Sequence, residues 1–372
     1  MKIGIIGTRG IPNNYGGFEQ CAEYLSLGLA ERGHDVTVYS SHRHSYTDSL
    51  WKNVHIIHCF DPEYILGTVG QFLYDLNCIL NTRGKKYDII LQLGYTSSSV
   101  WGWLLPGKPI KTTNMDGLEW KRTKFSKPVQ LFLRFAEYLG VFFSDHLISD
   151  SIGIQKYILD KYKKDSVFIP YGAFLMSGPD ENILKEFSLD PFKYFILIAR
   201  MEPENSIEII LDGIVESRIQ TPILVVGNAS NKFGKYLRNK YRKCSGIRFL
   251  GSIYDIKKLN NLRHYSAMYF HGHTVGGTNP SLLEAMASGS LICANDNIFN
   301  RHVLNDDAYY FRTSGEISKL LNEISFGSLH QQNMIERNIV KINEKYNWVE
   351  IVKLYEEHFY DILTRRISRI KK

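Results

Sequence analysis

Apolar, β-favouring runs alternate with longer helix-compatible segments along almost the whole chain. These runs are continuous rather than strictly alternating, which is typical of strands buried on both faces of a parallel sheet. The helices between them impose right-handed crossovers. The strand candidates fall into two series, residues 2–6, 35–39, 54–58, 88–92, 110–114, 146–149 and 166–169, and then 194–199, 222–226, 247–250, 267–271, 290–294 and 309–311. Two such series predict two doubly wound α/β sheets.

The break between the two series predicts the domain organisation. Residues 171–191 are rich in glycine and proline and hold only a short helical stretch, so we expect domains over 1–175 and 176–346. The tail, 347–372, reads as one long helix that returns to the first domain. Its apolar residues recur on one face, namely Trp348, Val352, Tyr355, Phe359 and Ile362. Because ligands of open α/β sheets bind at the carboxyl ends of the strands, we expect a cleft shared by the two Rossmann-like domains.

Composition narrows the class of protein. A chain of 372 residues with 44% hydrophobic and 22% charged residues is typical of a globular protein with two domains. The five cysteines are scattered without a CxxC pair or metal-ligand spacing, which favours a reducing, cytoplasmic location. The first ten residues read as a buried strand, not a signal peptide. No uncharged run approaches the roughly 18–20 residues that span a bilayer. We therefore expect a protein that does not cross a membrane.

The net charge of +7 suits anionic partners such as nucleotide diphosphates or lipid phosphates. A generally solvated surface is an equally good explanation. No nucleic-acid-binding signature accompanies the charge, so nucleic acid is not an expected partner.

A glycine-rich segment, GTRGIPNNYGGFE, follows the first predicted strand and opens the first helix. Glycines such as Gly16 and Gly17 let backbone N–H groups approach an anionic ligand at a helix start, and Arg9 adds a cation. The same segment could be a tight strand-to-helix turn. It is not GxGxxG, and no acidic residue ends the second strand. Both observations count against a nicotinamide cofactor.

A second segment, HGHTVGGTNPSLLEAMASG from His271 to Gly289, carries the strongest signal. A strand ends, the turn holding Gly276 and Gly277 follows, and a helix begins near Asn279-Pro280 with Asn279 as its cap. We expect a diphosphate to dock on the free N–H groups at this helix start, those of Thr278, Ser281 and Leu282.

Two kinds of side chain in this segment are candidates for ligand contacts. Glu284 lies about one turn into the helix, where its carboxylate could accept hydrogen bonds from a ribose hydroxyl pair. Alternatively, Glu284 only caps its helix. His271 and His273 resemble a metal pair, but no acidic or cysteine partner is spaced to join them. We therefore expect hydrogen-bonding histidines and no metal.

This second segment resembles the donor-binding motif of retaining GT-B glycosyltransferases, the family that includes glycogen-synthase-like and sucrose-synthase-like enzymes. The opening GIIGTRGIPNNYGGFE and the segment NMDGLEWKR, Asn114 to Arg122, are similar more narrowly to a bacterial branch of rhamnosyltransferases. The resemblance covers essentially the whole chain. It implies retaining transfer of a sugar to a growing polysaccharide such as capsule or O-antigen, often on a lipid-linked acceptor. The substrate it implies is dTDP-rhamnose, with a UDP- or GDP-sugar as the alternative, and no separate cofactor.

The chain departs from the broad family at two positions. Gly276 stands where the first of two donor-bracketing glutamates would be, which leaves Glu284 alone. In the strand-loop after the linker, Arg200 is kept to stabilise the leaving diphosphate, but Asn205 replaces the family's lysine. A deoxysugar such as rhamnose offers fewer hydroxyls to recognise, which suits a lost glutamate.

The first domain supplies further candidates for catalysis. Asp116 ends a strand where many relatives carry a histidine near the sugar, although Asp116-Gly117 could be a simple turn. Asp150 and Tyr171 each follow a predicted strand and would point toward the cleft. Asp150 is a candidate general base or acceptor anchor, and Tyr171 a candidate hydrogen-bond donor. Helix capping and hinge packing are the alternatives.

The segment 120–143 is basic at first and aromatic afterwards. It is either a buried core helix or a surface that contacts the anionic cytoplasmic face of a membrane. We expect a transferase that holds its donor mainly in the second domain and a glycan or lipid-linked acceptor mainly in the first. The rival interpretations are a nucleotide-sugar epimerase or phosphorylase, and a non-catalytic nucleotide-sugar-binding protein.

Overall fold

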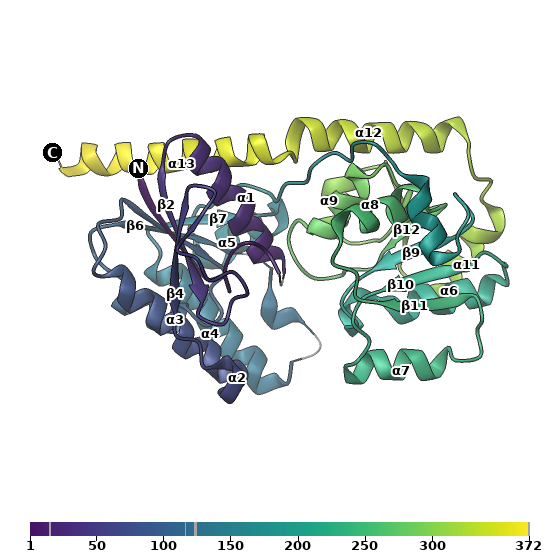
Figure 1. The fold of residues 1–372 in the computed structure, drawn as a ribbon, viewed down its shortest axis with the longest axis horizontal. Helices are drawn as coiled ribbons and strands as arrows, with labels where there is room; N and C mark the ends of the chain where they lie inside the picture. The colour runs from purple at the N-terminus through teal and green to yellow at the C-terminus, as the bar shows by residue number, and fades with distance from the viewer. Residues whose placement is uncertain (15, 116, 123–124, 371–372) are drawn as a thin grey trace. The chain divides into compact units, whose positions relative to one another are not determined.

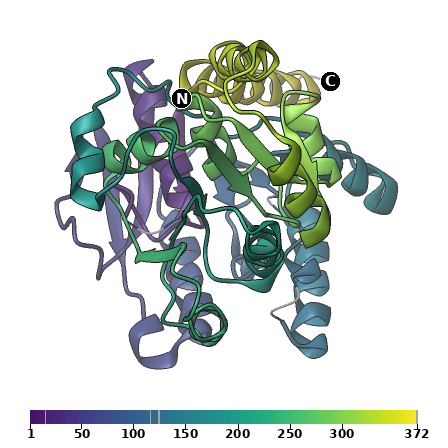
Figure 2. The same ribbon diagram turned by 90° about the vertical axis from the view of Figure 1, so that its right-hand side faces the viewer.

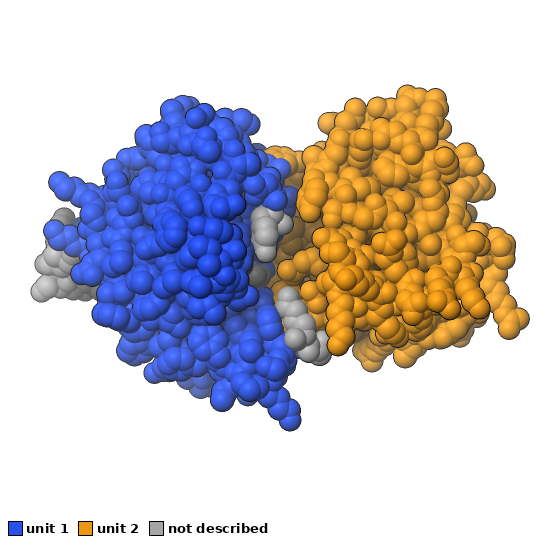
Figure 3. Space-filling view, turned by 60° about the horizontal axis from the view of Figure 1, so that its bottom comes forward, with its two compact units in different colours: residues 1–121, 125–171, 348–372 blue, residues 122–124, 172–347 orange. Residues whose placement is uncertain are grey.

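The structure, a computed structural model, describes residues 1–14, 16–115, 117–122 and 125–370. The chain forms two compact units, shown in separate colours in Figure 3. Unit 1 comprises 1–121, 125–171 and the chain from 348 onward, and unit 2 comprises 122–124 and 172–347. All five tryptophans of the sequence belong to unit 1.

Unit 1 is built on an eight-stranded sheet of order β3-β4-β2-β1-β5-β6-β7-β8 (Figure 1). All its pairings are parallel except that of β3 with β4. The core strands β1, β2 and β5 are buried almost throughout, as continuous apolar runs require. The strands are β1 (Lys2–Ile6), β2 (Asp35–Ser41), β3 (Leu50–Trp51), β4 (Val54–Cys59), β5 (Ile89–Leu93), β6 (Ile110–Asn114), β7 (His146–Ser149) and β8 (Val167–Phe168).

Helical segments connect these strands and cover the sheet. They are α1 (Gly17–Glu31), α2 (Glu63–Leu66), α3 (Thr68–Thr82), the 3-10 turns η1 (Ser99–Leu104) and η2 (Glu119–Lys121), α4 (Lys127–Phe143), α5 (Ile152–Tyr162) and α13 (Trp348–Ile370). The last of them, α13, packs on α1 although more than 300 residues separate them in the sequence. Trp348 lies 5.1 Å from Tyr24 between ring centroids, and Glu356 forms an ion pair with Arg32 and a 2.8 Å hydrogen bond with the ring of His34. Unit 1 is therefore assembled from both ends of the chain.

Unit 2 is built on a six-stranded, wholly parallel sheet of order β11-β10-β9-β12-β13-β14. Helices cover both of its faces (Figures 1 and 2). Its strands are β9 (Phe195–Ile198), β10 (Ile223–Val226), β11 (Ile247–Gly251), β12 (Met268–His271), β13 (Ile292–Asn295) and β14 (Tyr309–Phe311). Its helical segments are η3 (Glu181–Phe187), η4 (Pro203–Asn205), α6 (Ile207–Ser217), α7 (Lys232–Lys240), α8 (Ile256–His264), α9 (Pro280–Ala287), α10 (Ile298–Leu304), α11 (Ser314–Glu323) and α12 (Leu329–Lys345).

The prediction of two doubly wound parallel sheets is confirmed. In each sheet the chain first adds strands toward one edge, then returns to the middle and adds the remaining strands toward the opposite edge. The reversal falls between β1 and β5 in unit 1 and between β9 and β12 in unit 2. Such a switch point leaves a crevice at the carboxyl ends of the strands, where α/β folds bind ligands. No helix in the described part of the chain is both long and apolar enough to cross a membrane.

Candidate functional site

The candidate site lies at the switch point of unit 2, where three neighbouring strands end. Arg200 follows β9, the pair His271 and His273 straddles the end of β12, and Asn297 follows β13. Because β9, β12 and β13 are parallel neighbours, their carboxyl ends meet at one edge of the sheet. The fold thus gathers residues that lie almost 100 positions apart.

The loops after β9 and β12 are fastened to each other. Asn205 is buried, and its side-chain amide donates a 2.7 Å hydrogen bond to the carbonyl of Arg200. Thr274 donates two hydrogen bonds, from its N–H and its hydroxyl, to the carbonyl of Glu204 at 3.0 and 2.8 Å. Gly272 packs against the backbone of Asn205. Asn205 therefore shapes the Arg200 loop from within, a role that its place in a donor-binding motif did not suggest.

The two histidines stack on each other, with His271 buried and His273 half-buried. The rings of His271 and His273 lie 4.5 Å apart at 15°. Both ring nitrogens of His271 and Nδ1 of His273 are buried and have no hydrogen-bond partner among the described residues. Burial, followed by the charge of Arg200, lowers the pKa of His273 to about 3, and burial lowers the pKa of His271 well below its ordinary value. Two neutral imidazoles with unused nitrogens therefore face the same region as Arg200.

The histidine stack should make stability depend on pH. An unfolded histidine binds a proton below about pH 6.5, whereas folded His273 does so only near a pKa of about 3. The free energy of unfolding should therefore fall as the pH drops through this window, by about 1.4 kcal/mol per pH unit for each such group. We expect His273→Asn to flatten that slope in urea titrations followed by far-UV circular dichroism. The exposed His330→Asn is the control, and an equal flattening there would contradict the prediction.

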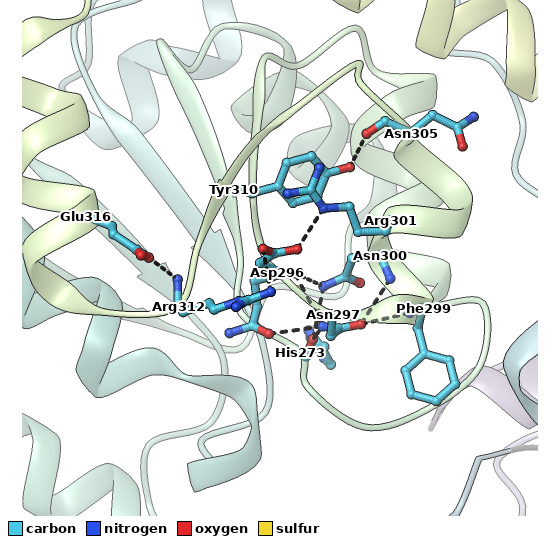
Figure 4. Close-up of polar contacts among 11 residues, drawn as sticks. His273, Asp296, Asn297, Phe299, Asn300, Arg301, Asn305, Tyr310, Arg312 and Glu316 are labelled. Carbon is cyan, nitrogen blue, oxygen red and sulfur yellow. Dashed lines mark hydrogen bonds and ion pairs between the residues drawn. The ribbon is translucent and has the colours of Figure 1, made fainter.

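The backbone of His273 is held by a set of asparagines that the sequence did not single out (Figure 4). Asn297 and Asn300 donate to the carbonyl of His273 at 2.9 and 3.1 Å. Beside them, Asp296 is bound by Arg301 at 2.7 Å and by Arg312 at 3.0 Å (Figure 4). The only signal in the sequence was a polar Asn-Asp-Asn run directly after a buried strand.

The start of α9 confirms one prediction and corrects another. Asn279 caps the helix, as predicted, because its side chain accepts from the N–H of Ser281 at 3.0 Å, and Pro280 is the first helical residue. The expectation that the N–H groups of Ser281 and Leu282 are free for a diphosphate is wrong. The first is taken by that cap, and the second donates to the carbonyl of Asn279 at 3.0 Å. A capping side chain and the turn itself use the donors that a ligand would need.

The turn before α9 retains the glycines that were expected to approach a ligand. Gly276 adopts φ +138°, a conformation that favours glycine, and the space beside its Cα is open. Gly277 is half-buried and Thr278 is buried. A side chain at position 276 would thus be strained by its backbone conformation rather than by crowding.

Asn279 caps α9, and the carboxylate of Glu284 is bound by a buried arginine. The guanidinium of Arg263, on α8, is 1% exposed and lies 2.5 Å from the Glu284 carboxylate, which is 18% exposed. Arg263 also donates to Asn260 at 2.9 Å and to the hydroxyl of Ser281 at 3.4 Å. The Glu284 carboxylate is thereby held in place by the buried guanidinium of Arg263.

The candidates of the first loop in unit 1 are already engaged. Arg9 makes a two-pronged ion pair with Glu63, at 2.8 and 3.0 Å, so a phosphate would have to compete with this carboxylate. The N–H of Arg9 donates to the buried Glu19 at 2.9 Å. Gly16 is the N-cap of α1 and Gly17 its first residue. The described residues of this segment thus form a strand-to-helix turn.

Two further candidates of unit 1, Asp150 and Tyr171, are withdrawn from solvent. Asp150 is fully buried between β7 and α5, near Tyr355 of α13, and both of its carboxylate oxygens are covered. Tyr171 is buried at the last position of its segment of unit 1. Asp116 lies outside the described residues. Within the described ranges, no group of three histidine, cysteine, aspartate or glutamate side chains is placed to hold a metal ion.

Two doubly wound α/β units in one chain define the GT-B fold, and comparison with known structures agrees. Sucrose-phosphate synthase from Thermosynechococcus elongatus superimposes with a TM-score of 0.77 at 14% identity, over 98% of this chain and 99% of that one. HepE from Anabaena, solved in complex with UDP and glucose, superimposes with a TM-score of 0.77 at 15% identity, over 97% and 99%. Identities this low show the fold and not the activity.

Sequence comparison adds two partial matches. Residues 107–174 match the model of a domain of unknown function, DUF1972. The uncharacterized glycosyltransferase MJ1069 of Methanocaldococcus jannaschii is 26% identical over 240 residues. The match covers 58% of this chain, which likewise spans 58% of the length of that relative.

Proposed function

We propose that the protein is a glycosyltransferase that transfers a sugar from a nucleoside-diphosphate donor held in unit 2. The observation that carries the proposal is the Glu284 carboxylate, fixed by a buried arginine at the switch point of a GT-B fold. A pairing that costs the desolvation of a guanidinium is unnecessary for packing alone. The complex of HepE with UDP and glucose, and the description of MJ1069 as an uncharacterized glycosyltransferase, support the same class of reaction.

In this proposal each polar group of the site binds a different part of the nucleotide-sugar donor. Arg200 is exposed and carries positive charge at the end of β9, which suits the diphosphate. Glu284 accepts hydrogen bonds from the ribose hydroxyls. The neutral nitrogens of His271 and His273 exchange hydrogen bonds with the sugar or its phosphate. No separate cofactor or metal is needed in this scheme.

The proposed reaction needs no protein nucleophile. The bond between the anomeric carbon and the diphosphate oxygen breaks, and the acceptor hydroxyl forms the new glycosidic bond on the same face of the sugar, with retention. The hydroxyl proton passes to the departing diphosphate, whose charge Arg200 stabilises. We assign the acceptor, a polysaccharide or lipid-linked oligosaccharide, to unit 1. The scattered free cysteines favour the cytoplasm as the place of reaction.

The sugar we propose is rhamnose, supplied as dTDP-rhamnose. Gly276 leaves open space where a glutamate would contact donor hydroxyls, and a deoxysugar needs fewer such contacts. Donor consumption by the purified protein tests this choice, with dTDP-rhamnose expected to turn over faster than UDP-glucose. Faster turnover of UDP-glucose would remove the basis for rhamnose while leaving the transferase class intact.

The substitution Arg200→Ala, which removes the guanidinium, should weaken nucleoside-diphosphate binding by about tenfold to a hundredfold. A hydrogen bond to a charged group contributes about 1.5–3 kcal/mol, and Arg200 is exposed, so its loss should leave folding unaffected. The measurement is a thermal-shift titration with UDP, GDP, dTDP and NAD. A ligand that binds only the folded state raises the melting temperature by mass action.

Two further variants sharpen this titration. Arg238→Ala, on the exposed side of α7, removes an arginine of unit 2 far along the sequence from the site and should change nothing. Glu284→Gln keeps an oxygen for Arg263 but loses the carboxylate charge, and should also weaken the shift. If NAD alone stabilises the protein, or no diphosphate does, the transferase proposal fails.

A further inference from the structure

The helix α4 of unit 1 carries an apolar stripe on its exposed side. Leu131, Phe135, Tyr138 and Phe142 follow one another at intervals of four, three and four residues, which places them on one face of the helix. Each of these side chains is between 49% and 69% exposed. Four large apolar residues in one continuous row differ from the single exposed apolar residues that are normal on any surface.

The opposite side of α4 already supplies its packing. Leu133, Ala136, Gly140 and Val141 are buried there. Glu137 is buried too, and its carboxylate accepts from Trp120, Tyr157 and Tyr162 and pairs with Lys161. The helix is therefore anchored to unit 1 without its outer stripe.

The structure also separates the aromatic residues of this segment into two groups. Phe132 packs edge-on against Phe72 of α3 at 5.6 Å, and Phe143 packs against Gly102 of η1. These two belong to the interior contacts between α3, η1 and α4. The stripe takes no part in these interior contacts.

Further exposed apolar residues lie on the neighbouring elements. The residues from 64 to 69, across α2 and the start of α3, form an uncharged run of exposed residues that includes Tyr64, Ile65 and Leu66. η1 joins α3 through a 2.8 Å hydrogen bond from the Trp101 indole to the carbonyl of Phe72, and its Trp103 is exposed.

The exposed charges of these segments are of one sign. In residues 60–86, 99–108 and 119–143, the described acids are buried, partly buried or paired: Asp61, Glu63, Asp75, Glu119 and Glu137. The exposed charged side chains described there are all cations, namely Arg83, Lys85, Lys86, Lys108, Lys121, Lys127 and Arg134. An apolar stripe flanked by exposed cations complements a surface with an apolar interior and anionic headgroups.

We propose that α4 is a membrane-docking helix that lays its stripe of Leu131, Phe135, Tyr138 and Phe142 into an anionic lipid surface. The helix lies in the interface without crossing it, and the flanking lysines and arginines contact the headgroups. A second copy of the chain is a poorer occupant, because it would bring the same cationic surface into contact with itself. The inference does not depend on the transferase activity.

Co-sedimentation of the full chain with phosphatidylcholine vesicles, with and without phosphatidylglycerol, tests the proposal. We expect binding only to the anionic vesicles, and an about tenfold or greater loss of binding in the double variant Phe135→Gln/Phe142→Gln. The matched control is Leu329→Gln/Val349→Gln, which removes two side chains that are 72% and 70% exposed elsewhere. Lys127→Glu should weaken binding, whereas Lys232→Glu should not, although each is the first residue of its helix.

Each alternative result would overturn the proposal. These are equal binding to neutral vesicles, no binding to either kind, or an equal loss in the control variants. A concentration-dependent dimer that the double variant abolishes would instead identify the stripe as an interface between copies. Nucleotide thermal shifts, measured in the same variants, should stay unchanged, so a failure here is distinguishable from a failure of the proposed transferase function.

Discussion

Replacing Glu284 with leucine is expected to lower the free energy of unfolding by about 3–5 kcal/mol, far more than one helix-surface substitution should. The reason is that Glu284 pairs with a buried arginine. Arg263 is 1% exposed, and its Nε already finds no partner among the described residues, so without Glu284 a buried guanidinium loses its counter-charge. Arg263→Met should cost less, because the Glu284 carboxylate that it leaves behind is 18% exposed and reaches water.

The double variant Arg263→Met/Glu284→Leu separates stability from function. Because this variant lacks both charges, it leaves no unpaired buried ion, and we expect it to be more stable than Glu284→Leu alone. We expect it still to fail to bind nucleotide. Urea unfolding must be followed by far-UV circular dichroism, because every tryptophan lies in unit 1 and its fluorescence does not report on unit 2. Glu336→Leu, an exposed glutamate on α12, is the control. A loss at Glu284 no larger than at Glu336 would show that the buried pair contributes little.

Gly272→Ala is expected to reduce sugar transfer by about a hundredfold and to destabilise unit 2 by about 3 kcal/mol. A methyl group at this position would overlap the carbonyl oxygen of Asn205 and lie 2.9 Å from Cδ1 of Ile210. The carbonyl oxygen belongs to the backbone and cannot swing aside, and the Ile210 side chain is itself buried, so the loops after β9 and β12 must separate. That movement displaces Arg200 from the histidines, and small displacements of charged groups are costly to catalysis.

The matched substitution for this test is Gly315→Ala in the first turn of α11, where an added methyl meets no atom within 4 Å. It should leave transfer unchanged and keep or slightly raise stability, because alanine restricts the unfolded chain. Full activity in Gly272→Ala would mean that the two loops are not held in a fixed relation. Donor consumption and urea unfolding together distinguish that outcome from simple misfolding.

The strands were predictable because the signal for each strand lies in the residues of its own short segment. Strands buried on both faces are typically continuous apolar runs, and the predicted range 2–6 coincides with β1. The two-residue strand β3 was missed, because it has too few residues to show any periodicity and depends on pairing with β4. The cap of α9 was also predictable, since Asn-Pro at a helix start is a local signal.

The polar architecture of the site was not predictable in the same way. Arg263 reaches Glu284 from a different helix, 21 residues away, and Glu63 reaches Arg9 from 54 residues away. Neither pairing leaves a mark in residue spacing, because it depends on how helices are placed around the sheets. For the same reason the sequence showed Ser281 and Leu282 as donors, but not that Asn279 had already taken their N–H groups.

The return of α13 to unit 1 has a consequence for the order in which the protein is made. Domains generally fold as the ribosome releases them, N-terminal first. Here the first-made half cannot be completed until the final residues emerge, because buried residues of α13 such as Ile351, Val352 and Phe359 belong to unit 1. Unit 2 is continuous from 172 to 347 and has its full sequence earlier. The half synthesised first is therefore the half that finishes last, and a nascent chain exposes the surface of α1 throughout the synthesis of unit 2.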